Sequence, residues 1–329
     1  MANSLEREAM ALAIGIAARV RTTASPNPWV GAAVIADGEV IALGATEAPG
    51  GRHAEIVALD SAGSRAQDST LVVTLAPCAH QGRTGPCVEA IKAAGVARVV
   101  VGTLDPDPQV SGRGLAALRE AGIDIEEACA EDAVKEQLAA YLHHRSTGRP
   151  LVILKLAATL DGQTAMTDGS SRWITSPEAR EDVHERRARA EAILVGAGTV
   201  RADDPELTVR LEGFEGRQPR RIVLGDIAES AKVHPCEVHH GDIEVLLDRL
   251  GSEGVLELLV EGGARVAYAL HRDHLVNRYL LYLAPAFAGG VGGAPLFDGP
   301  GAISMSELWR GRFASVAILG GDLCVEVVA

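Results

Sequence analysis

In the first half of the chain, segments whose apolar residues recur at helical spacing alternate with short apolar runs. Apolar residues recur at helical spacing over 4–20, and Asp37-Gly38 between the apolar runs 30–36 and 39–44 predicts a hairpin. Helices are predicted over 53–62, 87–94, 115–121 and 131–144, and strands over 70–75, 98–102 and 123–127. This order predicts a mixed sheet with helices on both faces.

A second α/β pattern follows the stretch Gly148-Arg149-Pro150, where we place a boundary between domains 1–147 and 148–329. The run 151–158 is apolar almost throughout, which is typical of a strand buried on both faces. Further strands are predicted over 190–196, 220–224, 255–260, 278–283, 315–319 and 323–328. Helices are predicted from Pro177, from Gly198-Thr199, over 242–250 and over 265–270.

Composition narrows the class of protein. A length of 329 residues favours two domains, and 47% apolar residues with only 3% aromatics predict cores of Ala, Val, Leu and Ile. A net charge of −13 argues against nucleic acid as a partner. Five cysteines do not form the pattern of a secreted disulfide framework, and no apolar run reaches membrane-spanning length. We therefore expect a cytoplasmic protein without a membrane partner.

The stretch from His53 to Cys87 carries the clearest chemistry. His53, Cys78 and Cys87 are residue types that bind Zn²⁺, and three protein ligands leave a fourth position open, as in catalytic sites. Glu55, two residues after His53, is placed to carry protons, as in zinc deaminases of nucleobases. The competing interpretation is a solvated helix start with two small buried thiols. The usual deaminase spacing is C-x-x-C, whereas eight residues separate Cys78 from Cys87.

That longer insert is part of a resemblance to a known family. The stretches 74–87 (TLAPCAHQGRTGPC), 27–31 (NPWVG) and 105–114 (DPDPQVSGRG) resemble the deaminase half of the bifunctional RibD family of riboflavin biosynthesis. The resemblance implies a cytidine-deaminase-like three-layer domain, with Asn27 bonded to the substrate and His80 outside the metal shell. The chain departs from the family at Ala76, where Glu is usual, and at Asp107, where Asn is usual.

In the second half, two strand-to-helix turns contain glycine pairs, Gly196-Ala197-Gly198 and Glu261-Gly262-Gly263. Such turns present backbone N–H groups to a phosphate, although many merely permit a tight turn. There is no Gly-x-Gly-x-x-Gly with an acidic residue at ribose-binding distance, so an ordinary Rossmann site is not expected.

The stretches 155–162, 172–175, 198–205 and 207–210 are similar to the reductase half of the same family, which is dihydrofolate-reductase-like in fold and uses NADPH. The similarity thins over 231–242. The resemblance implies NADPH contacts from Ala157, Trp173, Thr199, Asp203, Gly263, Ala264, Arg265, Val266, Ala267, Tyr268 and Ala269. It implies substrate contacts from Ser171, Arg187, Leu207, Arg210 and Glu261, and it implies a homodimer formed through the second domain.

Without the resemblance, two of these positions would be interpreted as structural and not as ligand-binding. Trp173 on its own is more often a packing residue, and Arg187 lies in the charge run 185–189, which is usually a solvated face. Arg187 and Arg210 are nonetheless of the type that clamps a ribose phosphate.

Together these observations predict a bifunctional enzyme acting on a small-molecule pyrimidine ribotide. The first domain would deaminate 2,5-diamino-6-ribosylamino-4(3H)-pyrimidinone 5′-phosphate, with zinc activating water and Glu55 moving protons. The second would use NADPH to reduce the ribosyl group to ribityl. Two alternatives stay open. One is a nucleobase or tRNA deaminase fused to an unrelated reductase. The other is a non-enzymatic binding module, which is considered because Ala76 replaces the usual Glu.

Overall fold

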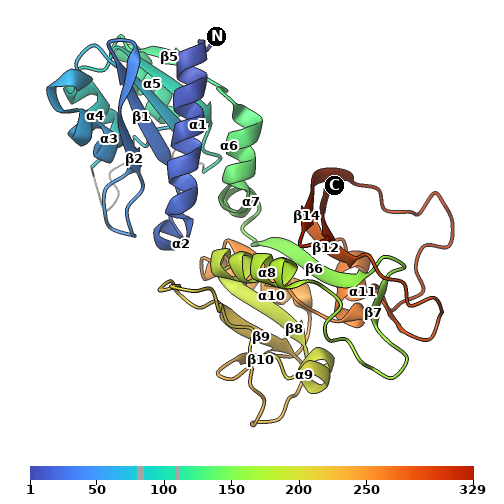
Figure 1. The fold of residues 1–329 in the computed structure, drawn as a ribbon. Helices are drawn as coiled ribbons and strands as arrows, with labels where there is room; N and C mark the ends of the chain where they lie inside the picture. The colour runs from blue at the N-terminus through green and yellow to red at the C-terminus, as the bar shows by residue number, and fades with distance from the viewer. Residues whose placement is uncertain (80–84, 108–111) are drawn as a thin grey trace. The chain divides into compact units, whose positions relative to one another are not determined.

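The computed structural model describes residues 1–79, 85–107 and 112–329, and the chain divides into two compact units, Met1–Gly148 and Arg149–Ala329 (Figure 1). Gly148 ends the last helix of the first unit with a φ of 76°, a left-handed conformation that favours glycine.

The first unit is built on a five-stranded mixed sheet in the order β2-β1-β3-β4-β5. Its strands are β1 (Gly31–Ala36), β2 (Glu39–Ala45), β3 (Thr70–Leu75), β4 (Arg98–Thr103) and β5 (Asp124–Glu126). β1 is antiparallel to β2 and β3, whereas β3, β4 and β5 are parallel. The predicted hairpin and the predicted mixed sheet are confirmed.

Helices cover both faces of this sheet. They are α1 (Ser4–Arg19), α2 (Arg21–Ala24), α3 (Ala54–Ala62), the 3-10 turn η1 (Gly63–Ala66), α4 (Cys87–Ala93), α5 (Arg113–Glu120), α6 (Glu131–Gln137) and α7 (Ala139–Thr147). α1 and α3 approach from opposite sides (Figure 1). Two glycines allow this approach, because a Cβ on Gly31 would lie 1.9 Å from the carbonyl oxygen of Ala13 in α1, and a Cβ on Gly44 would lie 2.3 Å from that of Ala54 in α3.

The single helix predicted over 131–144 is wrong, because the chain forms two helices that meet at Leu138. The indole N–H of Trp29 donates to the carbonyl oxygen of Gln137 (2.9 Å), and the Gln137 amide donates back to the Trp29 carbonyl (2.9 Å). Leu138 is fully buried with φ −99° and ψ 12°. The Trp29 indole thus uses a carbonyl that a continuous helix would use for its own ladder.

The second unit contains an eight-stranded sheet in the order β10-β9-β8-β11-β6-β12-β15-β14. The strands are β6 (Leu151–Thr159), β8 (Ala192–Gly196), β9 (Arg220–Leu224), β10 (Glu237–His239), β11 (Glu257–Val260), β12 (Arg278–Ala284), β14 (Arg312–Leu319) and β15 (Asp322–Val328). Parallel pairing runs from β10 to β12, and β15 and β14 continue antiparallel. β10 lies within 231–242, where no strand is predicted, and the small pair β7 (Gln163–Ala165) and β13 (Ala294–Pro295) is also additional.

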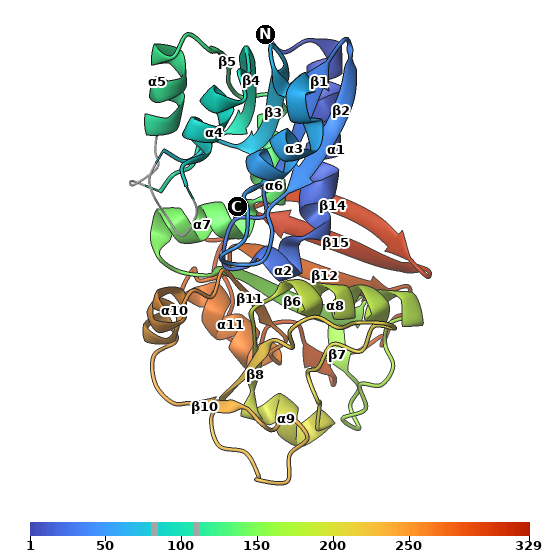
Figure 2. The same ribbon diagram turned by 90° about the vertical axis from the view of Figure 1, so that its left-hand side faces the viewer.

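The helices of this unit are α8 (Pro177–Arg189), α9 (Ala197–Asp203), α10 (Ile243–Ser252) and α11 (Ala264–Arg272). Leu154, Leu194 and Leu258 point from the sheet into a core that includes Leu246 and Leu250 of α10. α8 lies on the other side of the sheet from α10 and α11 (Figure 2). As predicted, α8 starts at Pro177, and Ser176 caps it by accepting from the Ala179 N–H (3.2 Å). Among the described residues, no helix combines the length and apolar character needed to cross a membrane.

Candidate active sites

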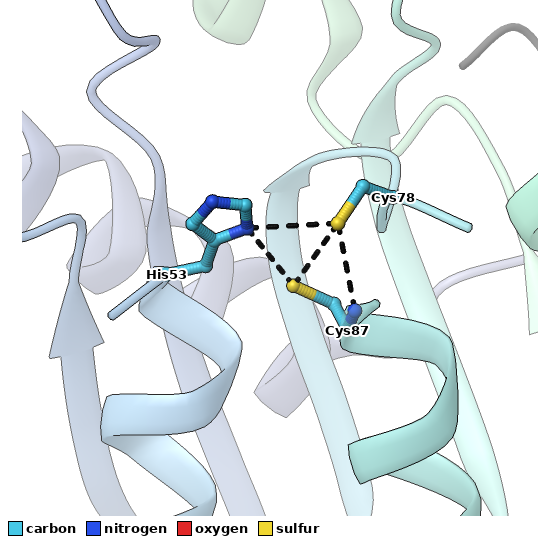
Figure 3. A group of neighbouring side chains, drawn as sticks. All are labelled: His53, Cys78 and Cys87. Atoms are coloured by element: carbon cyan, nitrogen blue, oxygen red, sulfur yellow. Dashed lines mark hydrogen bonds between the residues drawn. The ribbon is translucent and has the colours of Figure 1, made fainter. Parts of the chain in front are cut away.

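Local structure brings His53, Cys78 and Cys87 together at one edge of the first sheet (Figure 3). His53 is the N-cap of α3, Cys87 is the first residue of α4 after Pro86, and Cys78 follows β3. His53 Nδ1 lies 3.1 Å from Cys87 Sγ and 3.6 Å from Cys78 Sγ, and the two sulfurs are 3.5 Å apart. The three residues predicted to bind zinc thus converge beside two helix starts.

These distances are close to those around a shared metal, and the 3.1 Å between His53 Nδ1 and Cys87 Sγ is the one that a metal would lengthen. Ligands around one tetrahedral Zn²⁺ would be separated by about 3.8 Å between sulfurs and about 3.6 Å between nitrogen and sulfur. The donor set of one imidazole and two thiolates also suits zinc. Both thiols lie near helix N-termini, where the helix dipole favours an anion, and the Cys87 N–H approaches Cys78 Sγ at 3.5 Å.

Before a metal binds, only Cys78 is shifted toward the form that ligates it, the thiolate. The hydrogen bond between the two thiols lowers the pKa of Cys78 to about 4, with a further contribution from His53, and raises that of Cys87. The hydrogen bond to Cys78 raises the pKa of His53. His53 and Cys87 are shifted toward their protonated forms, so a metal would displace those protons when it binds.

Glu55 lies in the first turn of α3, two residues after His53, and is only 4% exposed. Burial raises the pKa of its carboxyl group, although the nearby His53 opposes the shift. A desolvated carboxyl group whose pKa is shifted toward neutrality can both take and return a proton. This environment fits the predicted role of Glu55, which stays a prediction.

The loops around the cluster are fixed by backbone contacts. The Ala76 N–H donates to the Thr103 carbonyl (3.0 Å), which ties the start of the Cys78 loop to β4. Asp105, directly beyond β4, is buried and accepts from the Tyr141 hydroxyl (3.1 Å) and the Asp107 N–H (2.9 Å). Asp107 therefore contributes its backbone here, as the usual Asn could.

Three predictions about this unit remain as they were. Asn27 is half-buried just before β1, and its role with substrate stays a prediction. His80 and positions 108–111 of the third motif lie outside the described residues.

In the second unit, Arg187 and Glu261 form a buried bidentate ion pair. Arg187 Nε and Nη2 donate to the two carboxylate oxygens of Glu261 at 2.6 and 2.9 Å, and Nη1 donates to the Thr208 carbonyl (3.0 Å). Lys155 Nζ lies 3.7 Å from the same carboxylate. Burial raises the pKa of Glu261, but the charges of Arg187 and Lys155 outweigh it and hold this pKa at about 2.

This geometry corrects the expectation from the charge run and adds a residue. Arg187 does not lie on a solvated face, since its side chain is only 10% exposed. Lys155 is not among the predicted site residues, yet its side chain is only 19% exposed and burial lowers the pKa of its ammonium group. Its signal in the sequence is a lysine inside an otherwise apolar strand.

Arg210 and Leu207 lie on the segment that Arg187 holds through Thr208. Arg210 is exposed; its Nη1 donates to Glu206 (3.1 Å) and Thr208 Oγ1 (3.1 Å). Leu207 is buried with a φ of 54°, an unusual conformation for a branched side chain. The structure thus brings Arg187, Arg210 and Glu261 into one neighbourhood.

Ser171, Trp173 and Asp203 form a second group. The Ser171 hydroxyl donates to Asp203 Oδ1 (3.1 Å), which joins a predicted substrate residue to a predicted cofactor residue. Trp173 is 70% exposed and stacks with the Arg180 guanidinium at 4.5 Å. It borders a pocket of about 250 Å³, so it is not a packing residue of the core.

The start of α11 fits a dinucleotide diphosphate. Gly263 is its N-cap without a side-chain cap, which leaves the first-turn N–H groups without that partner. A Cβ on Gly263 would lie 2.9 Å from Thr199 Oγ1, and one on Gly262 would lie 2.7 Å from Val266. Glycine therefore keeps the backbone accessible beside Thr199 at the start of α9. Ala157 lies two residues after Lys155 on β6, so both side chains are on the same side of the sheet.

Comparison with known proteins decides the family. Residues 150–325 match the RibD C-terminal domain, and residues 3–103 match the cytidine and deoxycytidylate deaminase zinc-binding region. The chain is 38% identical to the riboflavin biosynthesis protein RibD of Escherichia coli, over 97% of this chain and 98% of that one. It is 42% identical to RibD of Mycobacterium tuberculosis, over 98% and 97%. The chain belongs to the RibD family.

Solved RibD structures confirm the predicted fold classes over both units. RibD of Acinetobacter baumannii superposes with a TM-score of 0.91 at 34% identity, covering 98% of each chain. The diaminohydroxyphosphoribosylaminopyrimidine deaminase/5-amino-6-(5-phosphoribosylamino)uracil reductase of Thermotoga maritima superposes with a TM-score of 0.87, also at 34% identity and 98% coverage of each chain. RibD proteins are bifunctional deaminase/reductases of riboflavin biosynthesis, and their cofactors, Zn²⁺ and NADPH, are those predicted for this chain.

Proposed function

We propose that the first unit deaminates a diaminopyrimidinone ribotide and that the second unit reduces the ribosyl group of the product. The observation that carries the first assignment is the convergence of one imidazole and two thiols within 3.6 Å beside a buried carboxyl group. His53, Cys78 and Cys87 would hold zinc, which when bound supplies the Lewis acidity that lowers the pKa of a water.

Glu55 would carry the protons of the hydrolysis. Its carboxylate takes a proton from the attacking water and passes protons to the ring nitrogen and to the departing amino group. The water oxygen remains on the ring carbon as a carbonyl, and ammonia leaves. Asn27 would hydrogen-bond the pyrimidine. Asp105, held by Tyr141, would keep the loop beyond β4 in place beside the Cys78 loop.

In the second unit, NADPH would supply the hydride that reduces C1 of the ribosyl group. Opening of the ribosylamine ring leaves a C=N bond that needs one hydride at carbon and one proton at nitrogen. Lys155 would donate that proton, which is supported by its side chain being only 19% exposed and by burial lowering the pKa of its ammonium group. Arg210, with the remaining N–H groups of Arg187, would bind the ribotide phosphate.

Replacing Glu55 with Gln tests the first assignment. The variant keeps the shape of the side chain but cannot take a proton, so ammonia release should fall at least about 100-fold. Bound zinc and NADPH oxidation with the deaminated ribotide should be unchanged, which makes the second reaction an internal control. Ammonia release at the wild-type rate would remove Glu55 from the mechanism.

We propose a homodimer formed through the second unit. A bulge after Phe313 places Phe313, Val316 and Ile318 on one face of β14, the last strand of the sheet, and these side chains are 71%, 58% and 76% exposed. A second copy of the chain would cover this apolar stripe. Ile318→Glu should give monomers in sedimentation, and a dimer of unchanged stability would place the contact elsewhere.

The net charge of −13 supports a small-molecule substrate over nucleic acid.

A further inference from the structure

Two highly exposed aromatic rings border one pocket of the reductase unit. Trp173 is 70% exposed and Phe287 is 72% exposed, in a chain in which aromatics make up only 3% of residues. Both line a pocket of about 250 Å³ between the segment 159–174 and the segment 286–288. Isolated exposed rings need no explanation, but two at one cavity mark a binding site.

The backbone on each side of Phe287 is fixed to the opposite wall. The Leu160 N–H donates to the Ala286 carbonyl (2.8 Å). The Asp161 carboxylate accepts from the N–H groups of Ala288 (3.1 Å) and Gly289 (2.9 Å) and from the Thr159 hydroxyl (2.5 Å). Phe287 is therefore exposed on a segment whose position is set, and Asp161 supplies most of that constraint.

The rest of the lining matches a flat polar ring. Thr159, Ser170 and Ser171 line the pocket together with Met166 and Ile174. Aromatic side chains bind such rings by stacking. The three hydroxyl groups donate to the carboxylates of Asp161, Asp168 and Asp203, so toward a ligand they can accept from ring amide N–H groups. The volume is below the 300–1,000 Å³ typical of drug-sized ligands, so the pocket suits one ring with its substituents and not a whole dinucleotide.

We propose that Trp173 and Phe287 are the two apolar walls of a subsite for a planar nitrogen heterocycle, and that Asp161 is the positioning residue that holds the Phe287 wall. This inference rests on the proposed reductase reaction, since both of its ligands carry such a ring. The ring is either the nicotinamide of NADPH or the pyrimidine of the ribotide, and the test below separates the two.

The experiment uses Phe287→Ala in the full chain. NADPH affinity is measured by calorimetry, and the KM for deaminated ribotide is measured at saturating NADPH. Loss of one stacking wall should weaken one ligand by about 10-fold, equivalent to about 1.4 kcal/mol. A change in the NADPH Kd assigns the nicotinamide, and a change in ribotide KM alone assigns the pyrimidine. Phe287→Tyr should restore wild-type values, because it keeps the ring.

Met305→Ala is the matched control, since Met305 is equally exposed (73%) in the same unit and lines neither of the two pockets near Trp173. If Phe287→Ala, like the control, changes both constants less than twofold, the subsite is refuted. Wild-type protein that neither binds NADPH nor reduces the ribotide would instead refute the proposed function.

Asp161→Ala tests the positioning role. It should weaken the same ligand as Phe287→Ala, and the double variant should be no weaker than Phe287→Ala alone, because both changes act on one wall. Additive effects, or a loss of thermal stability with unchanged ligand constants, would overturn the role assigned to Asp161.

Discussion

Arg187→Ala should destabilise the reductase unit far more than an ordinary change on a helix. The side chains of Arg187 and Glu261 are 10% and 8% exposed, and two short hydrogen bonds join them. Removing the guanidinium leaves a buried carboxylate whose remaining ion-pair partner within the described residues is Lys155, 3.7 Å away. It also leaves the Thr208 carbonyl without its side-chain donor.

The magnitude follows from the pKa of Glu261. A depression from 4.5 to about 2 corresponds to about 3 kcal/mol of stability, at the lower end of the 3–5 kcal/mol expected when a buried pair loses one partner. Because the folded-state pKa is lowered, this stability is present above pH 4.5 and is lost as pH falls through about 2. The difference between variant and wild type should therefore be full at pH 7 and should narrow below about pH 4.5.

Urea unfolding at pH 7 measures this effect, with the reductase transition identified in the wild-type protein as the one that NADPH shifts. The two units need separate analysis, because a two-unit chain does not unfold in one two-state step. Arg189→Ala is the control on the same helix, since its ion pair with Glu185 is exposed and should contribute less than about 1 kcal/mol. A loss below about 1 kcal/mol for Arg187→Ala would refute the reasoning.

Two further predictions concern packing and pH. Gly44→Ala should destabilise the deaminase unit by about 1–3 kcal/mol in urea unfolding, because its Cβ would meet the backbone of α3 at 2.3 Å. Gly15→Ala in α1 meets nothing within 4 Å and should be neutral or stabilising, so equal effects of the two changes would contradict the packing argument. If Lys155 donates the proton, reductase kcat should fall as pH rises through its lowered pKa, and Lys155→Met should lose both rate and that limb of the profile. A profile unchanged in Lys155→Met would remove Lys155 as the donor.

The metal cluster could be predicted because its ligands are fixed by local structure. His53 caps α3 and Cys87 starts α4, and both helix starts follow from short-range patterns. Cys78 follows a strand that the apolar run 70–75 predicts. The three ligands also come from consecutive elements, because β3 lies between α3 and α4 in the chain. The start of α3, the loop after β3 and the start of α4 can therefore meet.

Other features depended on partners far away in sequence. The break at Leu138 comes from Trp29, 108 residues before the carbonyl that it binds. The charge run 185–189 taken alone favours a solvated face for Arg187, yet Ala179, Val183 and Arg187 follow each other at intervals of four and are all buried. This spacing places Arg187 on the apolar stripe of α8 and could have identified it. Nothing local indicates that its partner is Glu261.

The Arg187–Glu261 pair has a consequence for phosphate binding at the second sheet. Glu261 follows β11 directly and lies two residues before Gly263, where α11 begins. A lone carboxylate at that point would repel the anionic ligands that the helix N-terminus attracts. The two positive charges of Arg187 and Lys155 exceed the single negative charge of Glu261 by one. The three side chains together therefore favour a bound phosphate. Arg187→Ala removes that excess, and it should weaken NADPH and ribotide binding together, which a purely structural pair would not do once the variant is folded.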